Sequence, residues 1–487
     1  MLQRFLGMSR RRSRRAPLVI AAALIVSSAW TVSAAAAGRP NILVIVTDDQ
    51  RVETLAAMPH VRKELRAEGT SFRNAFVPNS LCCPSRASIL TGLHSHTTGV
   101  FDNVAPHGGF AAFDDRLSIA SVLDDEGYRT AFIGRYLNGY VGATYDNWSY
   151  VPPGWDRWFA VPTGSYQGYS AASDGSLVGP FGHGPRDYSA RVMTRTARRF
   201  IDEGRRRFFM LFMATAPHSG PERIDGVKVA TPAQRDVGRF DGLPRWRPPT
   251  FGAADDVSDM PAYLRLRRWS HQADRRIDLI RQRQLESLYS LDRQLGSLLR
   301  AVPRNTLVIF TSDNGFMWGE HRWRSKQVPY EESIRVPLIV RWPGHVGRDV
   351  DPRLALNIDI VPTILGAVGL DPDTPTGIKS RGGRVPPEGL DLFGGRRRRA
   401  FVLEHLEGSG GAVPSYCGVR TKRWMYARYS AARSEDDGFE DLYDIRDDPL
   451  QRRNLASLSA ADRAHERLRS MARELCSPPP PGYDWRD

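Results

Sequence analysis

Three short runs of apolar residues, each followed by polar side chains, place the strongest constraint on the fold of this chain. The runs and the polar residues after them are Asn41–Val46 with Asp48 and Asp49, Phe208–Met213 with His218, and Thr306–Phe310 with Asp313 and Asn314. Strands without a polar face are typical of parallel sheets covered by helices on both faces. A leucine pattern at three- and four-residue steps predicts one such helix over 281–300. We therefore predict a layered α/β fold with its functional site at the carboxyl ends of the strands.

Composition divides the rest of the chain into further parts. Residues 219–280 are rich in Pro, Arg and Asp and have poor periodicity, which predicts a long surface insertion. A Gly-, Pro- and Arg-rich stretch over 371–399 predicts a linker. The short apolar runs of 400–487 predict a smaller antiparallel α+β subdomain. The expected catalytic domain is then 38–370.

Residues 1–37 have the composition of a signal peptide. The first fifteen residues hold six arginines and no acid, an apolar run follows, and small residues end at Ala37. A single membrane anchor is the alternative reading. We expect an exported protein, secreted or in the cell envelope, without stable membrane insertion after signal removal. An oxidising destination would let Cys417 and Cys476 pair, and two unpaired thiols are the alternative.

The charge balance argues against one class of partner. The 487 residues include 68 basic and 54 acidic side chains, a net charge of +14, and only five of the basic residues are lysine. This uniform arginine bias differs from the clustered basic and aromatic residues of nucleic-acid-binding proteins, so no nucleic acid is expected as a partner. Without the six arginines of residues 1–37 the net charge is +8, which is compatible with an anionic substrate.

Two adjacent cysteines stand near the start of the most informative segment, Leu81-Cys82-Cys83-Pro84-Ser85-Arg86-Ala87-Ser88-Ile89-Leu90-Thr91-Gly92. Neighbouring cysteines rarely bond to each other, and the second pair that a zinc site needs is missing. Taken alone, the two cysteines are compatible with buried free thiols at the start of a helix.

The segment resembles the signature of type I sulfatases, which depend on formylglycine, and spaced motifs in the family's order extend the resemblance over nearly all of the chain after residue 37. It most resembles the branch of N-acetylglucosamine-6-sulfatases and extracellular endosulfatases. The further motifs are Asp48-Asp49, Phe76-Val77-Pro78, Tyr136-Leu137-Asn138, Ala216-Pro217-His218-Ser219, Leu442-Tyr443-Asp444-Ile445-Arg446-Asp447-Asp448-Pro449 and Asn454-Leu455.

The resemblance implies an alkaline-phosphatase-like sandwich with a large, mostly parallel central sheet. It also implies that a formylglycine-generating enzyme converts Cys82 to formylglycine (3-oxoalanine). The hydrated aldehyde would use one hydroxyl to attack the sulfur atom and the other to expel sulfate. A sulfated sugar or glycan would be the substrate.

A calcium ion is the second cofactor that the resemblance implies. Its ligands would be Asp48, Asp49, Asp313, Asn314 and the modified Cys82, and oxygen ligands suit a hard divalent cation. Taken alone, an Asp-Asp pair after a strand is more often a helix cap or turn, and Asp-Asn-Gly is a common turn signal.

The family pattern also assigns roles to residues around this centre. Arg86 is expected to hold the hydrated aldehyde, Lys326 to contact the sulfate, and His218 to protonate the leaving alcohol as general acid. His321 lies near enough in the pattern to line the pocket, although a surface histidine is equally compatible. His94 and His96 follow the signature helix and are expected only to pack against it or cap it.

One stretch departs from the family pattern. The family usually has Gly-Lys-Trp-His where this chain has Gly134-Arg135-Tyr136-Leu137-Asn138. Arg135 keeps the charge expected of a catalytic contact but not the geometry of a lysine. Asn138 replaces the usual histidine, as in the glucosamine-6-sulfatase branch, and the base of the sulfate-elimination step is left unassigned.

The leading expectation is an exported, calcium-dependent sulfatase acting on a sulfated sugar or glycan of the N-acetylglucosamine-6-sulfate kind. One alternative is a phosphomonoesterase or phosphonate hydrolase of the same superfamily. Another is a non-catalytic binder of sulfated polysaccharide with an unmodified Cys82. The presence of the whole set of expected catalytic and metal-binding residues argues against the binder.

Overall fold

The computed structural model describes residues 38–142, 145–252, 257–378, 382–408, 412–430 and 435–485. The predicted signal peptide, residues 1–37, lies outside the described residues. Contacts join Arg39–Asp487 into one compact unit. Among the described helices, none combines the length and the apolar composition needed to cross a membrane.

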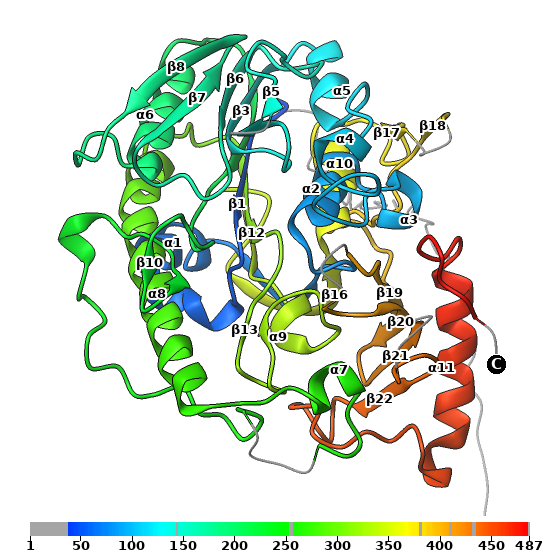
Figure 1. Cartoon of the computed structure of the whole chain (residues 1–487). Coiled ribbons are helices and arrows are strands. Elements are labelled where there is room, and N and C mark those ends of the chain that lie inside the picture. Colours follow the sequence, from blue (N-terminus) through cyan, green and yellow to red (C-terminus); the bar gives the residue numbers. More distant parts are fainter. Residues whose placement is uncertain are drawn as a thin grey trace, which may run out of the picture. The chain divides into compact units, whose positions relative to one another are not determined.

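A ten-stranded mixed sheet forms the centre of this unit, in the order β16-β2-β15-β12-β1-β9-β3-β6-β7-β8 (Figure 1). Its strands are β1 (Asn41–Thr47), β2 (Thr70–Phe76), β3 (Arg129–Arg135), β6 (Arg157–Val161), β7 (Tyr169–Ser173), β8 (Ser176–Phe181), β9 (Phe208–Met213), β12 (Thr306–Ser312), β15 (Leu338–Arg341) and β16 (Asp349–Leu356). The five neighbours β12, β1, β9, β3 and β6 run parallel. Antiparallel pairs lie toward both edges. The predicted α/β sheet with a parallel centre is confirmed.

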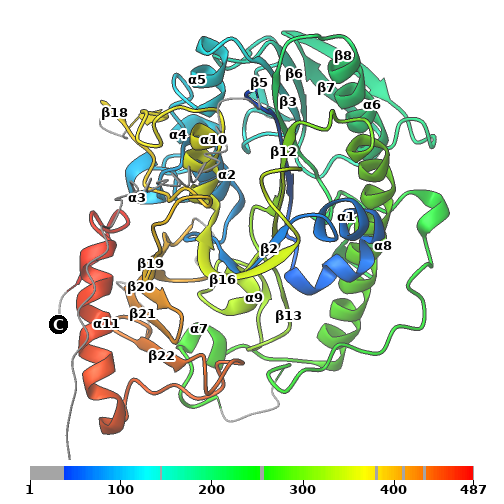
Figure 2. The ribbon, with the colours of Figure 1, turned by 180° about the vertical axis from the view of Figure 1, so that it is seen from behind.

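Helices cover both faces of the sheet, which explains why the central strands are apolar throughout. Along β1, Ile42, Val44 and Val46 belong to one apolar cluster, and Leu43 and Ile45 belong to another. This is the alternation expected of a strand whose successive side chains point to opposite faces. The covering helices are α2 (Cys82–Thr91), α5 (Ile119–Asp125) and α10 (Ile360–Ala367) on the first face, and α6 (Ser189–Asp202) and α8 (His271–Leu299) on the second. Figures 1 and 2 show the two groups on opposite sides of β1 and β12.

All three apolar runs form strands where the sequence predicts them, but the predicted helix 281–300 is longer than expected. It begins at His271, where the Ser270 side chain accepts a hydrogen bond from the Ala273 N–H and caps the helix. The added turns carry mostly polar residues, so no apolar period marks them in the sequence.

The remaining elements of the catalytic part are short. Two-stranded ladders join β4 (Val141–Gly142) to β5 (Tyr145–Asp146), β10 (Arg223–Ile224) to β11 (Val227–Lys228), β13 (Met317–Trp318) to β14 (Arg324–Ser325), and β17 (Gly377–Ile378) to β18 (Arg384–Val385). The short helices are α1 (Pro59–Val61), α3 (Ser95–Thr98), α4 (Gly109–Ala112), α7 (Ala262–Arg265) and α9 (Glu331–Ile334). The segment 219–280 thus contributes a hairpin, α7 and the start of α8, and it buries Val229 and Leu264.

A four-stranded antiparallel sheet with one helix forms the C-terminal part, as predicted. Its elements are β19 (Ala400–His405), β20 (Ser415–Thr421), β21 (Trp424–Ser430), β22 (Glu440–Asp444) and α11 (Asp462–Leu475). Cys417 on β20 and Cys476 after α11 form a disulfide, which decides between the two alternatives left open by the sequence. Phe401 of β19 packs with Phe76 of β2 in a shared apolar cluster, so this sheet is docked on the central one.

The described residues of the predicted linker 371–399 are tied to the core. Arg398 pairs with Asp359 at 2.7 Å, and the Glu388 N–H donates to the carbonyl of Gly92. The stretch therefore follows the surface of the catalytic part as an anchored connection.

Candidate active site

The carboxyl ends of two neighbouring strands bring three acids and one amide together. Asp48 and Asp49 follow β1, Asp313 and Asn314 follow β12, and the two parallel strands are in register up to Thr47 opposite Ser312. The Asp49 backbone has a positive φ of 70°, a conformation that aspartate tolerates better than most residues. Its N–H donates to Asp313 Oδ1 at 3.1 Å. The sequence prediction that these side chains meet at one edge of the sheet is confirmed.

These residues fit a hard cation. Oxygen atoms of Asp48, Asp49 and Asp313 lie within 4.8 Å of one another, and all three side chains are buried. Asn314 Nδ2 donates to Asp49 Oδ1 at 2.7 Å. The Asn314 Oδ1 atom, in contrast, is buried without a hydrogen-bond partner among the described residues. Three carboxylates with a free amide oxygen beside them form the oxygen-rich donor set that calcium prefers.

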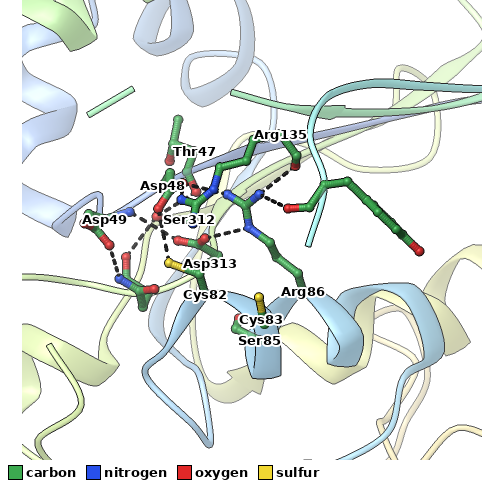
Figure 3. Close-up of polar contacts among 12 residues, drawn as sticks. Thr47, Asp48, Asp49, Cys82, Cys83, Ser85, Arg86, Arg135, Ser312 and Asp313 are labelled. Carbon is green, nitrogen blue, oxygen red and sulfur yellow. Dashed lines mark hydrogen bonds and ion pairs between the residues drawn. The ribbon is translucent and has the colours of Figure 1, made fainter. Parts of the chain in front are cut away.

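The two adjacent cysteines lie in different surroundings (Figure 3). Cys82, the first residue of α2, is buried with its Sγ 3.6 Å from Asp48 Oδ1 and 2.8 Å from Lys326 Nζ. Cys83 instead accepts a hydrogen bond from the Asn138 N–H at 3.2 Å. Burial raises the pKa of the Cys82 thiol to about 12, although the charge of Lys326 acts in the opposite direction. Unmodified Cys82 is therefore a neutral thiol at neutral pH and a weak nucleophile.

Arg86 joins the two strand ends to a third strand. It lies one turn after Cys82 on α2 and donates from Nη2 to Asp48 at 2.8 Å and from Nε to Asp313 at 2.9 Å. Its Nη1 donates to the backbone carbonyl of Arg135, the last residue of β3, at 2.6 Å. Because all these groups are buried, the guanidinium orients the two carboxylates firmly.

Arg135 reaches Asp48, one of these two acids, from β3. Its Nη1 pairs with Asp48, and its Nη2 donates to Asn138 Oδ1 at 2.7 Å. Burial lowers the pKa of Arg135 to about 10, so it still carries its charge at neutral pH. The departure from the family pattern thus keeps a cation at this edge, and Asn138 holds it there.

Lys326 and His218 complete the centre. Lys326 lies directly after β14 and pairs with Asp49 as well as with Cys82. His218, which follows β9, has a ring nitrogen within 4.8 Å of Cys82 Sγ and of an Asp48 oxygen. Its Nδ1 lies 2.7 Å from the Ser219 carbonyl. Burial, followed by the charges of Arg135 and Lys326, lowers the pKa of His218 well below its ordinary value of 6.5. All the predicted catalytic residues and metal ligands therefore gather at one place.

The three other histidines considered as candidates, His94, His96 and His321, lie outside this centre. His321 is buried and stacks on Tyr330 with ring centroids 4.2 Å apart. His94 and His96 pair through Nδ1 with Glu388 and Glu404, each at 2.9 Å. These two pairs tie the segment after the signature helix to later parts of the chain.

Two further residues, which were not expected from the sequence, support the centre. Asn103 accepts a hydrogen bond from the Cys83 N–H at 2.9 Å and so holds the start of α2. The hydroxyl of Tyr166 donates to the His218 carbonyl at 2.6 Å. Neither residue belongs to a motif, so the sequence carries no signal for them.

A cavity of about 410 Å³ opens beside this centre, and Asp49, His218 and Lys326 form part of its lining. A substrate in the cavity would meet Lys326 and His218 at one end, and the Cys82 sulfur lies directly behind Lys326, 2.8 Å from its Nζ. The arrangement is suited to attack on a tetrahedral anion whose charge must be offset during the reaction.

Comparison with known families agrees with this geometry. The model of the Sulfatase family matches residues 40–370, which include all these residues. The chain belongs to the sulfatase family. A second model, described as the C-terminal region of N-sulphoglucosamine sulphohydrolase, matches residues 319–477.

Two relatives illustrate the similarity. A putative extracellular sulfatase Sulf-1 homolog of Caenorhabditis elegans is 32% identical over 68% of this chain and 47% of its own length. The N-acetylglucosamine-6-sulfatase of Homo sapiens is 29% identical over 69% of this chain and 62% of its own length. This chain therefore matches about half to three fifths of these two curated relatives.

Solved structures share the fold. A protein in complex with its substrate D-glucosamine-2-N,6-O-disulfate has a TM-score of 0.73 and 22% identity, with 90% of this chain and 98% of that chain covered. A phosphonate monoester hydrolase from Silicibacter pomeroyi has a TM-score of 0.65 and 20% identity, with 90% of this chain and 95% of that chain covered. The fold expected from the resemblance is thus confirmed, and it occurs in enzymes that act on different anionic esters.

Proposed function

We propose that this sulfatase-family chain hydrolyses sulfate monoesters of a sulfated sugar or glycan of the N-acetylglucosamine-6-sulfate kind. The observation that carries the proposal is the position of Cys82, and not of its neighbour Cys83, among the acids, Lys326 and His218. The names of the two relatives and the disulfated glucosamine bound to the structural neighbour support this class of substrate.

Two groups would complete the centre. Calcium held by Asp48, Asp49, Asp313, Asn314 and residue 82 would polarise the sulfate, and conversion of Cys82 to formylglycine would supply a hydroxyl nucleophile. The unmodified thiol, whose pKa burial raises, is poorly suited to attack, and the hydrated aldehyde would supply the nucleophile in its place. A formylglycine-generating enzyme would be the maturation partner.

The chain's own residues have separate roles in the proposal. Lys326 lies beside residue 82 and offsets negative charge on the sulfate oxygens. Arg86 holds Asp48 and Asp313 in position, and Arg135 also holds Asp48. His218 donates a proton to the leaving oxygen as general acid. Its low pKa in the free protein requires that bound sulfate, with its negative charge, raise the pKa toward neutrality.

A phosphomonoesterase or phosphonate hydrolase is the second candidate, because a phosphonate hydrolase shares the fold. The match of the Sulfatase model through the whole candidate site favours sulfate. The matched part of the chain also includes the Cys82 signature.

We also propose an export route and a division of the chain. The signal-like composition of residues 1–37 and the relatives named as extracellular sulfatases support a secreted or cell-envelope protein. The proposed parts are a signal peptide (1–37), a catalytic domain (38–370), a connection (371–399) and a C-terminal subdomain (400–487).

Mass spectrometry of the tryptic peptide Asn74 to Arg86, from protein made in its native host, tests the proposal. The expected mass shows an aldehyde or its hydrate in place of the Cys82 thiol, and the same sample releases sulfate from N-acetylglucosamine-6-sulfate. An unmodified thiol together with release of phosphate from phosphate monoesters would contradict the proposal and favour the second candidate.

A further inference from the structure

Four cations on the wall of the 410 Å³ cavity take no part in the centre described above. These cavity cations are Arg223, Lys228, Arg276 and Arg324. They come from three separate elements, since Arg223 and Lys228 lie on the β10–β11 hairpin, Arg276 on α8 and Arg324 on β14. The only acid in the lining is Asp49, which is already paired with Lys326.

The cavity cations have no acidic partner among the residues that the structure describes. Within the part of the chain that the structure describes, no carboxylate lies within ion-pair distance of any of the four, whereas Arg86, Arg135 and Lys326 each have at least one. Arg223 donates only to the Gly226 carbonyl, at 2.9 Å. The Nε atom of Arg276 is buried without a hydrogen-bond partner among the described residues.

Like charges are also placed against one another. Arg223 and Lys228 are directly opposite in the antiparallel pair of β10 and β11, an arrangement that destabilises a hairpin. The pKa of Arg324 is lowered, first by burial and then by the positive charge of Arg276. A wall that accumulates cations at a cost in stability is suited to a ligand that brings the missing negative charge.

The wall is held in position before a ligand arrives. Val227 and Val229 of the hairpin segment pack against Ile280 of α8 in one apolar cluster. A Cβ atom added at Gly226, in the hairpin turn, would lie 4.0 Å from Arg276 Nη2, so this guanidinium reaches the turn. Such preorganisation lowers the entropy that binding costs.

We infer that the cavity cations form a second anion subsite, which binds a second anionic group, such as an N-sulfate, on the same sugar residue whose scissile sulfate lies at residue 82. The inference rests on the proposed function and makes the substrate class narrower. A cavity of about 410 Å³ is in the range of sites for small ligands, and it joins the cavity cations to Lys326 and His218 in one space.

Binding to the full-length Cys82→Ala chain tests the inference without turnover. Calorimetry at one fixed ionic strength compares D-glucosamine-2-N,6-O-disulfate with N-acetylglucosamine-6-sulfate. We expect the disulfate to bind at least about tenfold more tightly, as charge-assisted hydrogen bonds predict. Adding Arg276→Gln and Arg324→Gln to the Cys82→Ala chain should reduce the ratio of the two affinities to about one. The matched control Arg304→Gln, an exposed arginine before β12, should keep it.

Two outcomes overturn the inference: equal affinity of the two sugars for the Cys82→Ala chain, or a preserved preference in the doubly substituted chain. If that chain does not fold, Lys228→Gln on the exposed hairpin replaces it, with a smaller but measurable loss of preference expected. Sulfate release by the matured enzyme separates the two proposals. Release without a binding preference contradicts this inference alone, and a binding preference without release from either sugar contradicts the proposed function alone.

Discussion

Two sets of charged residues lie at and beside one cavity, and they differ in how their charges are satisfied. At the strand ends, the charge cluster of Asp48, Asp49, Asp313, Arg86, Arg135 and Lys326 is buried, and each of its cations pairs with an acid. The cavity cations are less buried and have no acidic partner among the described residues. The first set holds its own geometry, whereas the second set has its charge free for a ligand.

The first set is suited to the reaction itself, and the second set is suited to recognition of the substrate. Buried ion pairs are costly to desolvate and rigid once formed, which suits groups that must keep one geometry around a reacting atom. Half-exposed cations remain hydrated and can exchange water for an anionic group. The comparison predicts that substitutions in the two regions have different effects on turnover, stability and substrate preference.

The largest expected effect is at residue 82. Cys82→Ala should abolish sulfate release, because it removes the side chain beside the charge cluster that maturation would convert into a nucleophile. The matched control is Cys83→Ala, whose sulfur contacts the Asn138 N–H and not the acids, and it should retain turnover. A steady-state assay of both purified variants, with circular dichroism to verify folding, makes the measurement. Normal turnover in Cys82→Ala would refute the mechanism.

Removal of divalent metal should have the next largest effect. Polarisation of the sulfate by a cation contributes several kcal/mol, so chelation should lower kcat/KM about a thousandfold, and added calcium should restore it. Asp313→Asn should lower activity similarly, and calcium should not restore it, because one ligand charge is lost. Unchanged activity after exhaustive chelation, verified by elemental analysis, would contradict the assigned metal site.

His218→Ala should lower kcat about a hundredfold to ten-thousandfold, the usual contribution of general acid catalysis. A general acid is active in its protonated form, so activity should fall as the pH rises through its pKa. In the free protein that pKa lies well below 6.5, and the bound sulfate raises it. The alkaline limb of kcat should therefore lie at higher pH than that of kcat/KM. If the alkaline limbs of both kcat and kcat/KM persist in His218→Ala, they belong to another group.

The smallest expected effect is on the free energy of unfolding, which substitutions in the two regions should change by different amounts. Arg86→Gln leaves two buried carboxylates short of a partner, so it should lower the free energy of unfolding by about 3–5 kcal/mol. Arg276→Gln removes a partly exposed cation without an acidic partner, so the change should be within about 0.5 kcal/mol. Urea unfolding at a fixed calcium concentration compares the two variants. Equal losses would mean that the cavity cations are structural.

The strands and the polar residues that follow them were predictable because both are local features. β1, β9 and β12 form where apolar runs occur, and parallel pairing then brings Asp48, Asp49, Asp313 and His218 to one edge of the sheet. The polar first turns of α8 were not predictable, because exposed helical residues need no apolar period. Asn103 and Tyr166 were missed because their roles depend on contacts between distant segments.

The sequence by itself determined the family resemblance, the parallel α/β architecture and the residue types of the reaction centre, since each depends on short runs and fixed motifs. Only the tertiary structure decided that the Cys83 sulfur turns to the Asn138 N–H, that Cys417 bonds to Cys476, and that Arg135 pairs with Asp48. It also brought the cavity cations together from a hairpin, a helix and a strand. Those outcomes depend on the direction of side chains and on chain segments that meet only after folding, which no local pattern encodes.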